Sequence, residues 1–337
     1  MGRDLAIDLG SANTLVYRQG DGIVFDEPTV VALHGGTGQV IAMGEEAWRT
    51  LGGDTGNVLA VRPLREGTMT ELDVTQRMLA VVLQRLGVTR FPKPRVLACV
   101  PPSASPVARR AIERAIRYAG GRQVVPVEEP LAAAVGADLP VHEPIGNLIV
   151  DVGGGRSEMA VVSMGGVVSG RSASIGGFDL DAAVQDHIRG TYGVAIGEKS
   201  AEELKIAIGS AFPARTSRAA KVIGRELATG SMVEVTVDED ELRQAMAPVV
   251  KSLVEEARMT LAEAPPELTH DVLETGMFLT GGGSLLRGLD MLLAQECEVP
   301  VHVVERPLET VVRGAGRMLE HLDDYRTSFQ LLRRAFP

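Results

Sequence analysis

The stretch that decides the fold is LAIDLGSANT, residues 5–14. An apolar run ends in Asp8, a glycine-led loop follows, and a second apolar run leads to a glycine turn at residues 20–22. This pattern predicts a β-hairpin with an acidic residue at the end of its first strand. The stretch LIVDVGGGRS, residues 148–157, repeats the pattern when the two are aligned on Asp8 and Asp151. The repeat predicts two similar lobes whose hairpins face each other across a cleft.

Strands and helices alternate around the two hairpins. Turn residues and apolar periodicity predict an α/β fold with short connections. The further strands are expected at residues 95–100, 124–127, 233–237 and 277–280, and the helices at 105–119, 131–135, 177–191, 201–208, 239–262 and after Ser284, which we expect to cap the last of them.

Composition narrows the class of protein. The 337-residue chain carries a net charge of −10, which argues against a general nucleic-acid binder. No apolar run is long enough to span a bilayer, and the first strand follows the N-terminus so closely that we expect no signal peptide. Cys99 and Cys297 are far apart and form no CxxC pair. A reduced, cytoplasmic protein is the expectation.

Three strand ends run into glycine-rich loops, and the third is TGGG at residues 280–283. Such loops let several backbone N–H groups point at one phosphate, because no Cβ obstructs the approach. Asp8 and Asp151, facing each other, suit a hydrated Mg²⁺ that takes few protein ligands. A single Asp-Gly is usually only a turn, but the repeat and the third loop favour a nucleotide site. The chain has no GxxxxGK[ST] loop and no strand-linked GxGxxG fingerprint.

Long ordered segments resemble the MreB/Mbl family of bacterial actin homologues, from about Asp4 to Leu322. The matching segments are residues 8–17, 57–64, 128–134, 151–155 and 276–290. The resemblance implies the two-lobe, actin-like fold of the actin, Hsp70 and sugar kinase superfamily, with ATP and Mg²⁺ in a central cleft. It implies a lobe I of residues 1–141 plus 311–337, with a small subdomain at about 32–62. Lobe II would be residues 142–310, with a small subdomain at about 179–244.

The resemblance also assigns site residues. It makes Glu129 the catalytic, water-positioning residue, and it places Mg²⁺ on Asp8 and Asp151 through water. The nucleotide-binding residues that it implies are Ser11, Ala12 and Asn13 in the first phosphate loop, Gly153, Gly154, Gly155 and Arg156 in the second, Glu202, Glu203, Leu204 and Lys205 at the nucleoside, and Gly281, Gly282, Gly283 and Ser284 against the adenosine.

Simpler interpretations remain open for two of these groups. Glu202 and Lys205 lie three apart on a helix and would also suit a surface ion pair. Glu128 and Glu129 would also suit the start of a helix, where acidic side chains are favoured by the helix dipole.

Arg156 departs from the family pattern, which usually has Thr after the three glycines. A Thr hydroxyl would help to hold the attacking water, whereas Arg either binds phosphate or fills the space that the water needs. We therefore expect a weak ATPase that serves filament dynamics.

The family implies head-to-tail filaments on the inner face of the cell membrane that organise cell-wall synthesis and cell shape. The expected partners are further copies of the chain, the membrane and cell-wall synthesis proteins, with no nucleic acid. Membrane contact is expected through the loop around Phe91 or through an apolar stripe at residues 325–336, formed by Tyr325, Phe329, Leu332 and Phe336. The alternatives are a small-molecule kinase of the same superfamily, which should carry a substrate-binding insertion, and a degenerate nucleotide-binding scaffold, which Arg156 keeps open.

Overall fold

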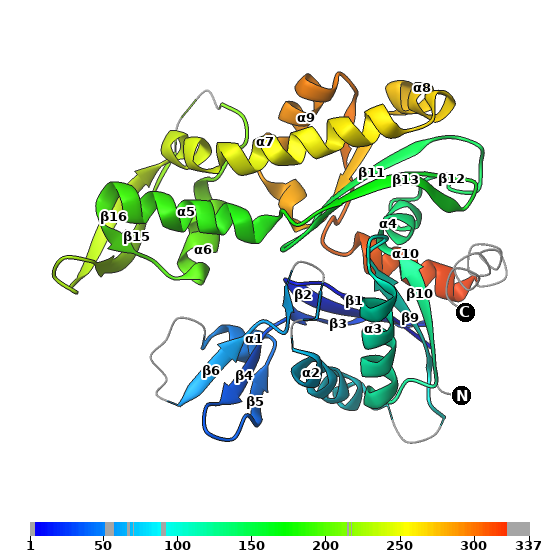
Figure 1. Ribbon diagram of the computed structural model, residues 1–337, viewed down its shortest axis with the longest axis horizontal. Coiled ribbons are helices and arrows are strands. Elements are labelled where there is room, and N and C mark those ends of the chain that lie inside the picture. Colours follow the sequence, from blue (N-terminus) through cyan, green and yellow to red (C-terminus); the bar gives the residue numbers. More distant parts are fainter. Residues whose placement is uncertain are drawn as a thin grey trace.

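A computed structural model describes residues 4–50, 57–65, 68–69, 71–88, 92–213, 216 and 218–321, which form two five-stranded sheets (Figure 1). The N-terminal sheet has the order β10-β9-β1-β2-β3, and the C-terminal sheet the order β13-β12-β11-β17-β18. Their strands are β1 (Leu5–Leu9), β2 (Asn13–Arg18), β3 (Gly22–Pro28), β9 (Arg95–Val100), β10 (Gln123–Glu128), β11 (Asn147–Val152), β12 (Ser157–Ser163), β13 (Gly166–Ala173), β17 (Met277–Thr280) and β18 (Val301–Val303).

The predicted hairpin repeat is present in the strand pairing. β1 is antiparallel to β2 and parallel to β9, and β11 is antiparallel to β12 and parallel to β17. Asp8 pairs with Leu15, and Asp151 pairs with Glu158, so the two acidic residues hold the same place in each hairpin. Both sheets therefore present an Asp and a glycine loop at the same end.

Strand residues alternate between two packing faces, as the pleat requires. Leu5 and Ile7 face the core under α2 (Leu72–Arg85) and α3 (Pro106–Ala119), whereas Ala6 faces the other way. In the C-terminal sheet, Leu148 and Val150 lie in the core with α5 (Gly177–Tyr192), α7 (Glu239–Glu263) and α9 (Leu289–Cys297). The long helices cover the outer faces of the two sheets.

Two helices lie between the sheets. α4 (Glu129–Gly136) and α10 (Thr310–Glu320) pack against each other and share one apolar cluster with both sheets. That cluster contains Ala6 of the N-terminal sheet and Ile149 of the C-terminal sheet, both fully buried. The two halves of the molecule are thus joined by a continuous core.

Small sheets extend from each half, and Figure 1 shows both on the left of the view. One is formed by β4 (Val31–His34), β5 (Val40–Met43) and β6 (Val58–Val61), next to α1 (Glu45–Trp48). The other is formed by β14 (Val194–Ala195), β15 (Ala219–Glu226) and β16 (Met232–Asp238), next to α6 (Glu198–Ile208). The boundaries of the lobes and of their small subdomains stay a prediction. The remaining elements are β7 (Leu64–Arg65), β8 (Thr68–Met69) and α8 (Pro266–Thr275).

The expected cap at Ser284 is wrong. Residues Gly282–Leu285 form a short 3₁₀ helix, and α9 begins only at Leu289, after Gly288 in the left-handed conformation. The Ser284 hydroxyl donates to the Gly281 carbonyl oxygen at 2.6 Å. Serine competes for backbone groups in this way, and here it closes the local turn instead of capping a helix. Among the described residues, no helix has the length and apolar character to cross a membrane.

Candidate nucleotide-binding site

A cavity of about 450 Å³ lies between the two halves. Its volume is within the range of small-molecule sites, roughly 300–1,000 Å³. Both hairpin loops, the glycine loop after β17, and the facing parts of α4, α5 and α6 contribute to its walls. The predicted site residues that line it are Asp8, Ser11, Ala12, Asn13, Glu129, Asp151, Gly153, Gly154, Gly155, Arg156, Glu202, Lys205, Gly281, Gly282 and Gly283.

Three predicted residues lie outside the cavity wall. Leu204 is buried in the core of the C-terminal half, Glu203 is exposed, and Ser284 is buried in its own turn. The helical period explains the first two, because residues three apart on α6 share a face. Glu202 and Lys205 therefore face the cavity together, and the residues between them do not.

The two phosphate-loop candidates approach each other closely. A Cβ on Gly154 would lie 2.8 Å from the Ala12 Cβ, which is closer than packed carbon atoms come. Each loop also requires its first glycine, since a Cβ on Gly10 would lie 2.7 Å from the Asn13 carbonyl oxygen and one on Gly153 2.8 Å from that of Arg156. The glycines thus allow the two loops to meet.

The start of α5 supports the second loop. The N–H of Gly177 donates to the Gly153 carbonyl oxygen at 3.0 Å, and the N–H of Phe178 donates to that of Gly154 at 2.7 Å. Phe178 also lines the cavity. The sequence predicts a helix here, but it does not predict that Phe178 belongs to the site. The signal was the Gly-Gly pair at residues 176–177, which allows this helix to begin against the loop.

Lys205 forms an ion pair that the sequence does not predict. Its Nζ lies 2.8 Å from Asp181 Oδ1 and donates to the Gly177 carbonyl oxygen at 3.1 Å. Burial raises the pKa of Asp181 to about 6, and the Lys205 ammonium opposes that rise. The structure pairs Lys205 with buried Asp181, so the alternative of a surface pair with Glu202 is wrong. Asp181 lies one turn after Phe178, so the helical period was the signal for it.

Four carboxyl groups gather at the strand ends. Burial, and then the charge of Asp151, raise the pKa of Asp8 to about 7, and burial raises that of Asp151 to about 6. Burial and the neighbouring Asp8, Glu158 and Asp151 raise the pKa of Glu129 well above its ordinary value. Desolvated carboxylates repel one another, so the cluster favours a bound cation.

The donor set fits Mg²⁺. Within the described residues, no group of three or more His, Cys, Asp or Glu side chains could hold a metal by itself. Two carboxylates suit Mg²⁺, which keeps several waters and takes its remaining ligands from phosphates. Asp8 and Asp151 are the residues that would hold it.

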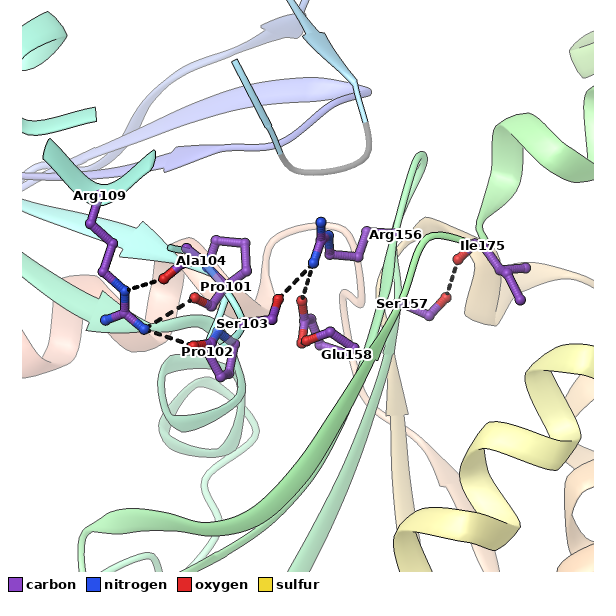
Figure 2. A network of polar contacts seen from close by, with 10 residues as sticks. Pro101, Pro102, Ser103, Ala104, Arg109, Arg156, Ser157, Glu158 and Ile175 are labelled. Carbon is purple, nitrogen blue, oxygen red and sulfur yellow. Dashed lines mark hydrogen bonds and ion pairs between the residues drawn. The ribbon is translucent and has the colours of Figure 1, made fainter. Parts of the chain in front are cut away.

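Arg156 connects the two halves (Figure 2). Its Nη1 donates to the Ser103 hydroxyl at 2.7 Å and lies 3.7 Å from Glu158 Oε1. Ser103 belongs to the loop between β9 and α3, which Arg109 holds by donating to the carbonyl oxygens of Ala104 and Pro102 at 3.0 and 2.8 Å. The guanidinium at the tip of the second hairpin is therefore held by a loop of the N-terminal half.

Comparison with known proteins decides the family. The family model described as MreB/Mbl protein matches residues 2–327, nearly the whole chain. The chain belongs to the MreB/Mbl family. It is 45% identical to the cell shape-determining protein MreB of Escherichia coli K12 over 326 residues, covering 95% of this chain and 94% of that one. It is 41% identical to the cell shape-determining protein Mbl of Bacillus subtilis 168 over 322 residues, covering 95% and 97%.

Solved structures of similar proteins have the same fold. MreB5 of Spiroplasma citri bound to ADP superposes with a TM-score of 0.91 at 29% identity, covering 95% of this chain and 97% of that one. The same protein bound to AMPPNP also gives 0.91, at 28% identity, covering 97% and 98%. A MamK double helical filament shares the fold with a TM-score of 0.78 at 20% identity, covering 94% and 98%. The prediction of an actin-like α/β fold is confirmed.

Proposed function

We propose that this protein is an ATP-binding bacterial actin whose membrane-associated filaments organise cell-wall synthesis and cell shape. One observation carries the proposal: in a member of the MreB/Mbl family, two repeated hairpin loops and a third glycine loop converge on one cavity. The relatives named above are cell shape-determining proteins, and the Spiroplasma relative was solved with ADP and with AMPPNP.

The chain's own residues divide the work of binding. The backbone N–H groups of the two hairpin loops hold phosphates, because their glycines let the backbone approach an anion. Asp8 and Asp151 would hold Mg²⁺ through water, and the ion would supply positive charge opposite the phosphates. Glu202 and Lys205 line the cavity from α6 and would contact the nucleoside, and Gly281, Gly282 and Gly283 line it after β17 and would lie against the adenosine.

Hydrolysis depends on Glu129, which begins α4 at the cavity wall. A carboxylate there can orient a water and accept its proton. Arg156 occupies the position next to it where relatives usually have Thr, and an arginine side chain carries no acceptor for such a water. We therefore propose a weak ATPase that serves filament turnover.

The filament would form when one surface of each copy of the chain binds a different surface of the next copy. Head-to-tail contacts that do not close produce open filaments, and the relative MamK was solved as a double helical filament. The filament would lie on the inner face of the cell membrane, in the cytoplasm, with cell-wall synthesis proteins as partners. Phe91 and residues 325–336, the two expected membrane contacts, lie outside the described residues.

Electron microscopy of the purified protein tests this function. We expect filaments with ATP–Mg²⁺ and only short or no filaments without nucleotide. Asp151→Asn should lose the Mg²⁺-dependent response, because it removes a charge that faces the metal, whereas Asp186→Asn on the exposed side of α5 should keep it. Monomeric protein at high concentration with ATP–Mg²⁺ and lipid vesicles would contradict the proposal.

A further inference from the structure

Arg62 makes a second connection between the two halves of the molecule. It follows β6 of the N-terminal half, and its guanidinium carbon lies 4.9 Å from the ring centroid of Trp48 and 4.4 Å from that of Phe178. Its Nε lies 2.7 Å from Glu198 Oε1. Trp48 belongs to α1 of the same half, whereas Phe178 and Glu198 begin α5 and α6 of the other half. We call these four residues the Arg62 contact.

The chemistry of the Arg62 contact makes it a strong one. The Arg62 side chain is only 8% exposed, so water screens its interactions weakly. A planar guanidinium stacks on aromatic faces while its N–H groups bond a carboxylate, which the point charge of a lysine cannot do together. The hydrogen bond to Glu198 is charge-assisted on both sides. Separating the two halves at this point breaks the stacking on Phe178 and the hydrogen bond to Glu198, whereas the stacking on Trp48 stays within the N-terminal half.

Phe178 and Glu198, the two members of the Arg62 contact in the C-terminal half, lie on helices that contribute to the wall of the nucleotide cavity. The Phe178 N–H bonds the Gly154 carbonyl oxygen, and a Cβ on Gly154 would lie 3.2 Å from the Phe178 ring. Phe178 is therefore in contact with the second phosphate loop. Glu198 begins α6, which carries Glu202 and Lys205 into the cavity. One arginine thus binds the element behind the phosphates and the element beside the nucleoside.

We propose that Arg62 is a positioning residue that couples closure of the two halves to the geometry of the second phosphate loop and so retains bound nucleotide. The inference rests on the proposed nucleotide binding and adds a residue that does not line the cavity. Nucleotide release requires the halves to separate, and the Arg62 contact opposes that separation. Loss of the contact should therefore act mainly on the dissociation rate of nucleotide.

The test measures dissociation of a fluorescent methylanthraniloyl-ATP, bound with Mg²⁺, after mixing with excess ATP. Arg62→Ala removes both the charge-assisted hydrogen bond and the stacking, and it should raise the dissociation rate about tenfold. Glu198→Gln keeps an acceptor oxygen but loses its charge, and it should raise the rate about threefold. The double variant should be no faster than Arg62→Ala, since the effect of Glu198 requires Arg62 as its partner. Arg62→Lys keeps the charge and loses the stacking, so its rate should be intermediate.

The matched control is Arg171→Ala. Arg171 pairs with Glu256 at 2.7 Å, and both residues lie within the C-terminal half. Its loss should leave nucleotide dissociation unchanged. Trp48 is the only tryptophan of the chain, so its fluorescence reports on the contact directly. Saturating ATP–Mg²⁺ should protect Trp48 from acrylamide quenching in the native protein and in Arg171→Ala, and should give no added protection in Arg62→Ala.

The outcomes separate this inference from the proposed function. If native protein binds no methylanthraniloyl-ATP, the proposed function fails and the inference with it. If native protein binds it, while Arg62→Ala and Glu198→Gln release it at the native rate, the inference alone is overturned. A lower melting temperature with a native dissociation rate would likewise reduce Arg62 to a structural role.

Discussion

Asp8 ends its strand among other carboxyl groups, and the fold raises its pKa from 3.8 to about 7. The folded protein therefore binds this proton more tightly than the unfolded chain does, so the free energy of unfolding falls as pH rises from about 4 to about 7. Asp8→Asn removes that effect. With divalent cations chelated, we expect the variant to be about 1–2 kcal/mol more stable than the native protein at pH 8, by thermal unfolding.

The same substitution should weaken Mg²⁺-dependent ATP binding, because the amide carries no charge toward the metal.

The stability difference between Asp8→Asn and native protein should widen from pH 5 to pH 7 and stay level above it. Asp186→Asn, on an exposed residue, should show no such trend. A stability difference that is the same at pH 5 and pH 8 would contradict a burial penalty on Asp8.

Arg156 donates a hydrogen bond to Ser103 of the N-terminal half and lies 3.7 Å from Glu158. A guanidinium favours phosphate binding in the ground state, whereas catalysis needs interactions that improve only in the transition state. Arg156→Thr should therefore raise the steady-state ATPase rate about three- to tenfold and weaken ATP affinity by about tenfold. Coupled phosphate release and equilibrium nucleotide titration measure the two effects.

Arg156→Lys serves as the control, since it keeps the charge and adds no hydroxyl acceptor; its ATPase rate should stay as low as that of the native protein. A fall in rate in Arg156→Thr would show that Arg156 acts on developing transition-state charge, as an arginine finger does.

At the scale of elements, α4 and α10 determine where Glu129 lies. A Cβ on Gly314 of α10 would overlap the Ala132 carbonyl oxygen of α4, and one on Gly136 would overlap that of Thr310. The two helices thus approach at backbone contact. Gly314→Ala should lower stability by about 3 kcal/mol, near the upper end of overpacking costs, because backbone cannot yield as a side chain does. Thermal unfolding measures this effect.

Gly190→Ala in α5 is the matched control, because a Cβ there meets nothing within 4 Å. It should leave stability unchanged or raise it by up to about 1 kcal/mol, since alanine favours a helix over glycine. If Gly314→Ala unfolds at the native temperature, the close packing of α4 on α10 is not required.

At the scale of the whole molecule, three contacts between the described parts of the two halves bear on how the halves move. The apolar cluster of α4 and α10 contains residues of both sheets and forms the permanent joint. The Arg156–Ser103 bond and the Arg62 contact are polar connections that can break and reform without exposing a core. Motion of the halves should therefore turn about the α4–α10 cluster, and the nucleotide-release prediction depends on that motion.

Local signals in the sequence were sufficient for the hairpins, the glycine loops and most elements. Asp8 and Asp151 were predictable because the strand period and the loop glycines act within ten residues of chain, and because the same pattern occurs twice in the sequence. The family resemblance then placed Glu129, Arg156 and the glycines of residues 281–283, and all of them line the cavity. A strand that ends in Asp and glycine has few alternative structures, so these features were readable from the sequence.

Only the tertiary structure determined which side chains pair with the charged residues of the site. Lys205 pairs with Asp181, Arg156 with Ser103, and Arg62 with Phe178 and Glu198, all across chain separations that no local pattern encodes. The turn at Ser284 also depended on a single hydrogen bond that competes with a helix cap. The Arg156 and Arg62 contacts arise only once the two sheets are packed on α4 and α10, whereas the Lys205–Asp181 pair needs only α5 and α6 to pack together. The raised pKa values of the carboxyl groups arise from burial in the folded protein. The physical reason is that desolvation and distance depend on the packed halves, whereas turns and strand period depend on neighbouring residues.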